Sequence, residues 1–378
     1  MLLKNLHRTT IFILLWVLFT FSAAACSDGN RSPLDDDDII FKEEPVDREI
    51  RHYKAIPNDL VLIYDGGAHR SISWNKEHFA PYVSADVNGE RRWLFDGFLF
   101  LEIKDGKGRG FASGYEKLGA RKVEWENLLK HYFANGNGIH ALNAGIAEVI
   151  KDNRVHGIYT KRKVVISLPE PIPNQTDWGQ LDGRSLQFFN KKDRLDACKW
   201  YIDYALELFR SANFEHVELV GFYWLAEEAT NSRTLSADVA DYLYGKNYDF
   251  YWIPYFNSDG YAEWKNLGFN IPYYQPNYFF NESVPYSRLQ EACDRAKRLQ
   301  MNLEVEFDER VLKSNKGWGY RLRDYLDVYE KNGVFDSVNV AYYQGGDAFY
   351  RLSQSSDVDD QMLYRRMVDL IIQRSAKP

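Results

Sequence analysis

Cysteine is scarce in this chain, with three residues among 378, at positions 26, 198 and 293. No C-x-x-C spacing occurs, so a zinc site built on that motif is excluded. Cys198 and Cys293 stand within helical patterns, and we expect both to be buried free thiols. A disulfide between Cys198 and Cys293 is the alternative, although nothing specific in the sequence supports it.

Nucleotide-binding signatures are also missing. The first apolar run is followed by "DGGAHR" (65–70), which is not the G-x-G-x-x-G turn of a dinucleotide-binding sheet, and no P-loop occurs. Formal net charge is -7 with both signs spread along the chain, which argues against nucleic-acid binding. We expect neither a cofactor nor a resident metal.

The chain lacks an apolar run long enough for a comfortable transmembrane helix. Lys4, His7 and Arg8 precede the short run Ile11–Phe21, and "SAAAC" follows it, which is the pattern of a secretory signal. The small residues before Cys26 resemble a bacterial lipoprotein box. That resemblance implies cleavage before Cys26, lipidation of its sulfur and export to a bacterial membrane, with the outer membrane favoured. A plain signal peptide is the alternative.

A polar segment, "SDGNRSPLDDDDIIFKEEP", follows Cys26 and has no periodic apolar face, so it reads as a flexible tether. Its acidic run Asp35–Asp38 lacks the spaced oxygen ligands of a calcium loop and is interpreted as a solvated spacer. We therefore assign residues 1–25 to the signal, 26–55 to the tether and 56–378 to one folded domain.

Short apolar runs and longer helical patterns alternate through that domain. The eight runs are "LVLIY" (60–64), "LFDGFLFLEI" (94–103), "KVVISL" (163–168), "VELVGFYW" (217–224), "DFYWIPY" (249–255), "GFNIPYY" (268–274), "NLEVEF" (302–307) and "SVNVAYY" (337–343). Helical periodicity separates most of them, and only the first connection, 65–93, looks irregular. Eight strand–helix repeats predict an α/β fold of the (β/α)8 TIM-barrel type; a doubly wound open sheet is the alternative.

In such a barrel the functional groups lie at the carboxyl ends of the strands. Acids, amides and aromatic residues follow the predicted strands, whereas no His or Cys does, which leaves no Ser-His-Asp triad and no zinc site there. Paired carboxylates with flat aromatic rings match glycoside hydrolysis. The candidate substrate-binding residues are Asp65, Asp96, Gln275 and Asn277, with aromatic walls from Trp252, Tyr255, Tyr278 and Tyr343.

The seventh predicted strand carries three acids on one side. Residues alternate sides along a strand, so Glu304, Glu306 and Asp308 share the side that faces the barrel interior. Buried carboxylates are costly unless they are paired or hydrogen-bonded, and a salt-bridge network with barrel Arg or Lys is the alternative interpretation.

Two acids are the candidate catalytic pair. Glu227 follows the fourth strand and would protonate the leaving oxygen, while Glu306 would attack the anomeric carbon. Glu228, Glu304 and Asp308 are alternates. Carboxyl groups about 5–5.5 Å apart imply retention of configuration, which we favour, and about 6.5–9.5 Å implies inversion.

Several long motifs resemble the bacterial domain-of-unknown-function family 4855. They are "LVGFYWLAEE", "WIPYFNSDGYAEWKNLGFN", "QPNYFF", "NLEVEFDE", "FDGFLFLE" and "AYYQGG", and together they span about residues 58–350. The resemblance implies a (β/α)8 barrel on secreted or lipidated proteins of polysaccharide-using bacteria. An acid on strand four and a nucleophile on strand seven then follow only by analogy with glycosidase barrels.

The sequence therefore predicts a lipid-anchored glycoside hydrolase whose partners are a carbohydrate substrate and a membrane. Two alternatives stay open. One is a glycan-binding surface lipoprotein without catalytic activity, and the other is a structural lipoprotein that docks partners through its helical exterior.

Overall fold

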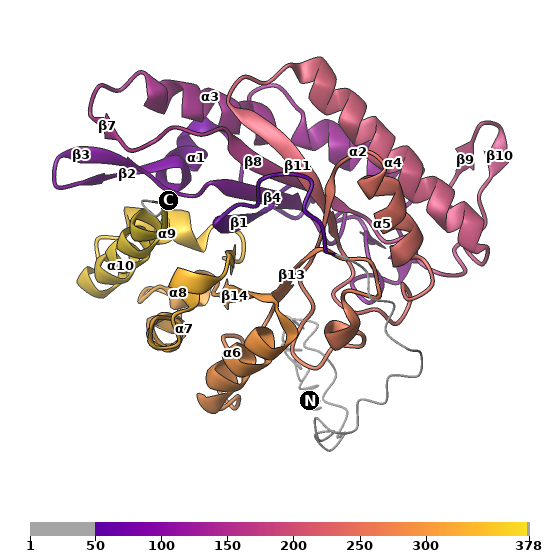
Figure 1. The fold of residues 1–378 in the computed structure, drawn as a ribbon. Coiled ribbons are helices and arrows are strands. Elements are labelled where there is room, and N and C mark those ends of the chain that lie inside the picture. The colour runs from indigo at the N-terminus through magenta and orange to yellow at the C-terminus, as the bar shows by residue number, and fades with distance from the viewer. Residues whose placement is uncertain (1–49, 376–378) are drawn as a thin grey trace, which may run out of the picture. The chain divides into compact units, whose positions relative to one another are not determined.

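The computed structural model describes residues 50–375, and within them the eight apolar runs form one closed barrel of parallel strands (Figure 1). Every neighbouring pair is parallel. Around the barrel the strands are β1 (Asp59–Tyr64), β15 (Val340–Tyr343), β14 (Asn302–Glu306), β13 (Ile271–Tyr274), β12 (Asp249–Trp252), β11 (Val217–Trp224), β8 (Arg162–Leu168) and β4 (Gly97–Leu101). The predicted fold class is confirmed.

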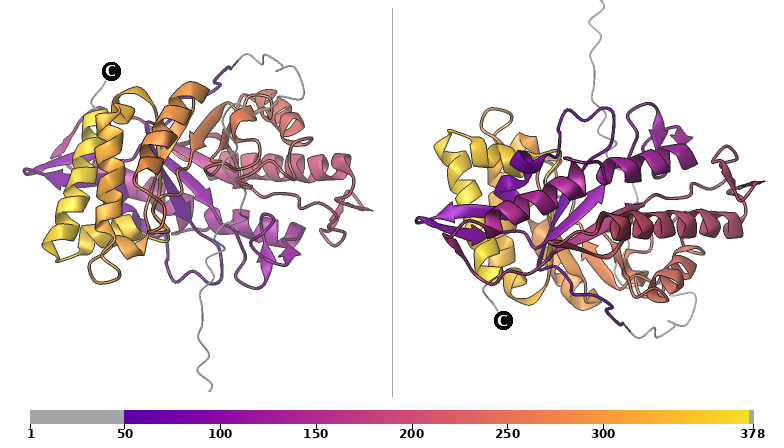
Figure 2. Two further views of the ribbon diagram at one scale, coloured as in Figure 1. Left: turned by 90° about the horizontal axis from the view of Figure 1, so that it is seen from below. Right: turned by 90° about the horizontal axis from the view of Figure 1, so that it is seen from above.

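Helices surround the strands, as the apolar faces of their sequences require (Figure 1 and Figure 2). They are α1 (Lys76–Val83), α2 (Lys122–Tyr132), α3 (Gly138–Ile150), α4 (Lys191–Ala212), α5 (Ser236–Tyr244), α6 (Ser287–Leu299), α7 (Gly319–Lys331), α8 (Val334–Ser337), α9 (Ala348–Gln354) and α10 (Val358–Ser375), with short 3-10 turns at Tyr261–Glu263 and Glu309–Val311. In α4, Asn190 caps the first turn through the amide of Lys192, and Asn213 ends the helix in a left-handed conformation. Cys198 and Cys293 are buried free thiols, as predicted.

The first connection is more regular than its sequence indicated. It contains α1 and a hairpin of β2 (Ser84–Val87) and β3 (Glu90–Trp93), which joins β7 (Val155–His156) in a small sheet. Asn88 and Gly89 both have positive φ, which fits a two-residue hairpin turn. Two more short pairs lie outside the barrel: β5 (Arg109–Gly110) with β6 (Leu118–Gly119), and β9 (Gln180–Leu181) with β10 (Arg184–Ser185).

Asp96 lies at the amino ends of the strands, opposite the mouth, because β4 starts after it at Gly97. Its carboxylate accepts the backbone N–H groups of Asn58 and Asp59 at 3.1 and 3.0 Å, and Lys163 Nζ lies 3.3 Å away. Asp96 therefore ties strand starts together, and its predicted role in substrate binding is wrong.

The chain enters the barrel at this same end. The backbone N–H groups of Tyr53 and Lys54 each donate to the Asp249 carboxylate at 2.9 Å, and the Asn270 amide donates to the Arg51 carbonyl at 2.8 Å. Residues 51–54, assigned from sequence to the end of the tether, thus belong to the barrel domain. The signal at 1–25, the lipidation site Cys26 and the rest of the tether lie outside the described residues.

No helix within residues 50–375 combines the length and apolarity needed to cross a bilayer.

The C-terminal helix closes the amino end of the barrel through one buried guanidinium. Arg374 Nε lies 2.8 Å from Asp59 Oδ1, and the same side chain donates to the carbonyls of Asn58 and Val338 at 2.7 and 3.0 Å. The Tyr342 hydroxyl donates to Asp59 at 2.7 Å. Burial raises the pKa of Asp59 to about 7 although Arg374 opposes it.

Arg374→Ala should lower the free energy of unfolding by about 3 kcal/mol, because it leaves Asp59 and several carbonyls buried without their donor. Denaturant unfolding at about pH 8, where Asp59 is mostly ionised, is the measurement. Arg365→Ala, an exposed arginine on the same helix, is the control and should change stability by less than about 0.5 kcal/mol. Equal losses in the two variants would contradict the assignment.

Candidate active site

Three glutamates meet at the carboxyl ends of β11 and β14. Glu227 lies three residues beyond the end of β11, and Glu304 and Glu306 share one side of β14. Glu304 and Glu306 have no solvent-exposed surface, and the charge of Glu227 acts on both of them. The interior column of acids is therefore present. Within the described part of the chain neither β14 glutamate forms an ion pair, so the alternative of a salt-bridge network does not hold.

Glu306 is surrounded by groups that favour its ionised form. Its Oε2 accepts the backbone N–H of Asn277 at 2.7 Å and the Tyr325 hydroxyl. Asn277 takes a left-handed conformation with φ 54°, which aims its N–H at the carboxylate. Burial nevertheless raises the pKa of Glu306 to about 8, with a further contribution from the charge of Glu227. Burial thus favours the protonated form of Glu306, and the two hydrogen bonds favour its ionised form.

Glu304 lies deeper and receives less support. Both of its carboxyl oxygens are buried, and no residue within 50–375 forms a hydrogen bond of ordinary geometry with them. Burial raises the pKa of Glu304 well above its ordinary value, and the charges of Glu306 and Glu227 raise it further. The Gln275 side chain lies near enough to favour the ionised form but does not outweigh burial. Glu304 therefore keeps its proton near neutral pH.

Glu227 retains partial solvent exposure although protein atoms surround its carboxyl group. Burial raises its pKa to about 7, while hydrogen bonds from Tyr115 and Gln275 favour the ionised form. The backbone just before Glu227 is held in place, since the Trp252 indole N–H donates to the Ala226 carbonyl at 2.8 Å. Glu227 is consequently a carboxyl group that can exchange a proton near neutral pH.

The remaining candidate acids are held by other partners. Glu228 accepts the Tyr255 hydroxyl at 2.8 Å, so these two predicted residues lie together at the mouth. Asp308 caps the turn Glu309–Val311 and pairs with Arg310 at 2.5 Å. Asp308 is therefore neutralised by a cation, which leaves it less suited to chemistry than Glu227 or Glu306.

Two of the four predicted aromatic walls are wrong. Trp252 is fully buried and stacks on Phe269 with ring centroids 4.6 Å apart. Tyr278 is also buried: its hydroxyl donates to Asp324 at 2.6 Å, and the Arg321 guanidinium lies 3.8 Å from its ring centroid. Both rings face the helix layer, so they cannot stack on a sugar.

Tyr343 does lie at the mouth. It ends β15 and is half-buried, and its ring meets Tyr64 edge-on at 5.6 Å and Phe280 at 5.4 Å. Burial raises the pKa of Tyr343, so its hydroxyl stays protonated. With Tyr255 it forms what remains of the predicted aromatic lining.

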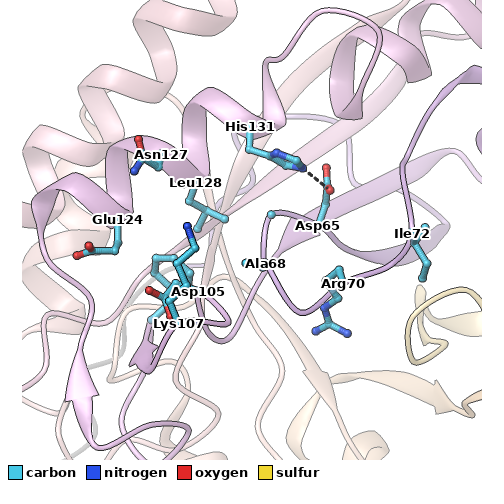
Figure 3. Close-up of a pocket in the computed structure, with 13 residues that line it drawn as sticks. Asp65, Ala68, Arg70, Ile72, Asp105, Lys107, Glu124, Asn127, Leu128 and His131 are labelled. Carbon is cyan, nitrogen blue, oxygen red and sulfur yellow. Dashed lines mark hydrogen bonds and ion pairs between the residues drawn. The ribbon is translucent and has the colours of Figure 1, made fainter.

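Asp65 follows β1 and belongs to a neighbouring cavity of about 510 Å³ (Figure 3). Its carboxylate accepts from His131 Nε2 at 2.7 Å and from the Asn137 amide at 3.0 Å. Neither Glu227 nor Glu306 lines this cavity. Gly66 has φ 104°, and a Cβ there would lie 2.8 Å from Leu128, so glycine lets this loop approach α2.

Several side chains at this end of the barrel were not predicted from the sequence. Tyr325 lies on α7 and Tyr115 in the loop after β5, so strand ends alone could not reveal them. The periodicity of α7 places Tyr325 on a buried face, which was the one available signal. His131 stands 66 residues from its partner Asp65, and no local pattern joins them. Among residues 50–375 no group of three or more His, Cys, Asp or Glu is arranged to hold a metal ion.

Folding stability should fall as pH rises from about 5 to 8. The folded chain keeps protons on Glu304, Glu306 and Glu227 that the unfolded chain releases above its ordinary glutamate pKa, so the unfolded state gains relative stability. Glu304→Gln removes one such group and should reduce this loss by about 1 kcal/mol or more, since one pKa unit corresponds to about 1.4 kcal/mol.

Chemical denaturation at about pH 5 and pH 8 measures the effect. Glu207→Gln, an exposed glutamate on α4, is the matched control and should follow the parent at both pH values. Identical pH dependence in parent and Glu304→Gln would show that Glu304 ionises normally.

Solved structures offer only remote likenesses. Methylaspartate ammonia lyase from Clostridium tetanomorphum is 10% identical with a TM-score of 0.40, over 84% of this chain and 59% of that one. The carboxyl transferase domain of Rhizobium etli pyruvate carboxylase is 8% identical with a TM-score of 0.37, over 84% and 48%. An endo-1,4-β-D-mannanase from Thermotoga petrophila is 12% identical with a TM-score of 0.31, over 65% and 74%.

The chain thus spans less than two thirds of the length of the first two of these proteins. Likenesses this weak carry no argument about function. No curated protein matches the chain. One family model does match, and it extends over residues 59–369, from the first barrel strand into the last helix. The chain therefore belongs to the family described as "Domain of unknown function (DUF4855)".

Proposed function

We propose that this protein is a glycoside hydrolase that cleaves a polysaccharide or oligosaccharide outside the cytoplasm. One observation carries the proposal: Glu227 follows β11 and Glu306 ends β14, and they lie close enough for the charge of Glu227 to raise the pKa of Glu306. Glycoside hydrolysis needs two carboxyl groups held in different protonation states by their environments. The two groups here have different surroundings.

Glu227 has the properties of the general acid. A pKa of about 7 keeps a large fraction protonated at neutral pH, and partial exposure lets the group meet a glycosidic oxygen. Glu306 is the proposed nucleophile, since Asn277 and Tyr325 donate to its Oε2 and would stabilise the attacking carboxylate. Burial raises the pKa of Glu306 to about 8, so the free protein gains this carboxylate only as the pH rises towards 8.

In the proposed reaction, the Glu227 proton passes to the leaving oxygen as its bond to the anomeric carbon breaks. The Glu306 carboxylate bonds to that carbon. Water then attacks the same carbon, Glu227 takes up the water proton, and the Glu306–carbon bond breaks to restore both groups. This sequence retains configuration and requires the two carboxyl groups to approach about 5–5.5 Å.

Access to Glu306 is part of the proposal. Its carboxyl group has no exposed surface, so the side chains above it must separate before a sugar can reach it. Movement of this kind on substrate binding is common where an active site excludes water.

A glycan-binding lipoprotein without catalytic activity is the rival. It depends on aromatic walls, and the burial of Trp252 and Tyr278 leaves only Tyr255 and Tyr343 of the predicted set at the mouth. The acid pair, by contrast, is not required in such a protein.

Glu227→Gln and Glu306→Gln should each lower turnover by about 10²–10⁴-fold or more while glycan binding persists, because the proton donor or the attacking group is lost. The measurement is digestion of a glycan panel with product analysis, including the anomeric configuration of the first product by NMR. Glu228→Gln and Asp308→Asn are the matched controls and should retain most activity.

No release of product from any glycan by the parent, with binding intact, would replace this proposal by the glycan-binding rival. Parent-like turnover in Glu306→Gln would remove the nucleophile from that residue.

We also propose export and lipid attachment at Cys26, on the evidence of the apolar run Ile11–Phe21 and the small residues before the cysteine. The chain joins the barrel at Arg51–Lys54, on the end opposite the glutamates.

Cys26→Ser should move the protein from the detergent phase to the aqueous phase in Triton X-114 partitioning, because no acyl chain can be attached. The control is Cys293→Ser, which should leave partitioning unchanged. Equal partitioning of parent and Cys26→Ser would exclude lipidation at this residue.

A further inference from the structure

The cavity beside the barrel mouth has a polar, preformed wall. It lies between α2 and the loop that follows β1, and Figure 3 shows His131 on the helix reaching across to Asp65 on the loop. Asp65 is 2% exposed, whereas the His131 side chain is 43% exposed. The imidazole is therefore held in place at one nitrogen and presents the rest of its ring to the cavity.

The charges around this cavity are balanced. Arg70 forms a two-point ion pair with Glu102 at 2.7 and 2.9 Å, and Glu124 pairs with Arg121 at 2.6 Å. Lys107 and Asp105, of opposite sign, also line it. A volume of about 510 Å³ lies within the range of small-molecule sites. The lining thus suits an uncharged ligand that carries many hydroxyl groups.

Arg70 connects the cavity to the barrel mouth. It lines the cavity, and its guanidinium carbon lies 4.8 Å from the centroid of the Tyr64 ring. Tyr64 in turn contacts Tyr343 and is acted on by the charge of Glu227. The cavity and the glutamate cluster are thereby linked through the side chains of Arg70 and Tyr64.

We propose that the cavity lined by Asp65 and His131 is a subsite for a neutral sugar residue of the glycan chain that reaches Glu227. The inference rests on the proposed function for the identity of the ligand. The imidazole and the exposed Asn127 amide would hydrogen-bond sugar hydroxyls, while the buried Asp65 orients the imidazole. The substrate is then an oligosaccharide or polysaccharide rather than a single sugar with a small aglycone.

The test uses the full chain carrying Glu227→Gln, so that binding is measured without turnover. Its probes are cellohexaose, mannohexaose, xylohexaose and maltohexaose with the matching disaccharides, and a hexagalacturonide as the charged comparison, all by calorimetry. His131→Ala and Asn127→Ala are added singly; both side chains are exposed, so the fold should tolerate them. His156→Ala, an exposed histidine on β7, is the matched control.

We expect at least one neutral hexasaccharide to bind more tightly than its disaccharide and than the hexagalacturonide. His131→Ala and Asn127→Ala should each weaken the affinity for the hexasaccharide by about 3- to 10-fold, as loss of one hydrogen bond does. Their affinity for the disaccharide should not change, and His156→Ala should bind both sugars as the parent does. Parent affinity in both cavity variants, preference for the charged probe, or no binding by any probe overturns the subsite.

The two proposals fail separately. If the cavity variants weaken binding as expected but the parent protein never cleaves the hexasaccharide, the protein binds glycans and is not a hydrolase. If turnover depends on Glu227 but does not change in His131→Ala, the protein is a hydrolase and the cavity is not its subsite.

Discussion

Burial of carboxyl groups inside the barrel is the constraint on which the site depends. A carboxylate moved out of water must keep its proton or collect donors, because the interior solvates charge poorly. Glu304 meets this requirement by staying protonated, and Glu306 by accepting from Asn277 and Tyr325. Glu227, partly exposed, has a pKa of about 7, which is below the pKa of about 8 at Glu306. One physical cost thus produces three carboxyl groups with three different proton affinities.

The rest of the fold supplies what these groups need. The left-handed turn at Asn277 directs a backbone N–H, α7 delivers the Tyr325 hydroxyl, and Trp252 holds the carbonyl just before Glu227. None of these supports comes from the strand that carries its acid. At the opposite end, Arg374 of the last helix pairs with Asp59 at the start of β1. Asp96, just before β4, accepts backbone N–H groups at the start of β1 and so joins these two strands. The barrel therefore separates a structural end from a polar mouth.

Much of the barrel was predictable, because eight apolar runs separated by helical periodicity leave few other folds. Strand alternation also placed Glu304 and Glu306 in one column. Asp96 was misplaced because an apolar run does not mark where its hydrogen-bonded strand starts. The directions of Trp252 and Tyr278 were unpredictable, since Phe269 and Asp324 determine them from distant parts of the chain. The same holds for His131, which a tertiary contact alone brings to Asp65.

The state of Glu227 is the most direct test of this electrostatic picture. Carbon-13 NMR of protein labelled at the glutamate carboxyl, titrated beside Glu227→Gln to identify the resonance, reports its ionisation without any substrate. We expect a midpoint of about 7, as burial at the mouth imposes. A midpoint near 4.5, the ordinary value for glutamate, would contradict it and remove the general acid from the proposed mechanism.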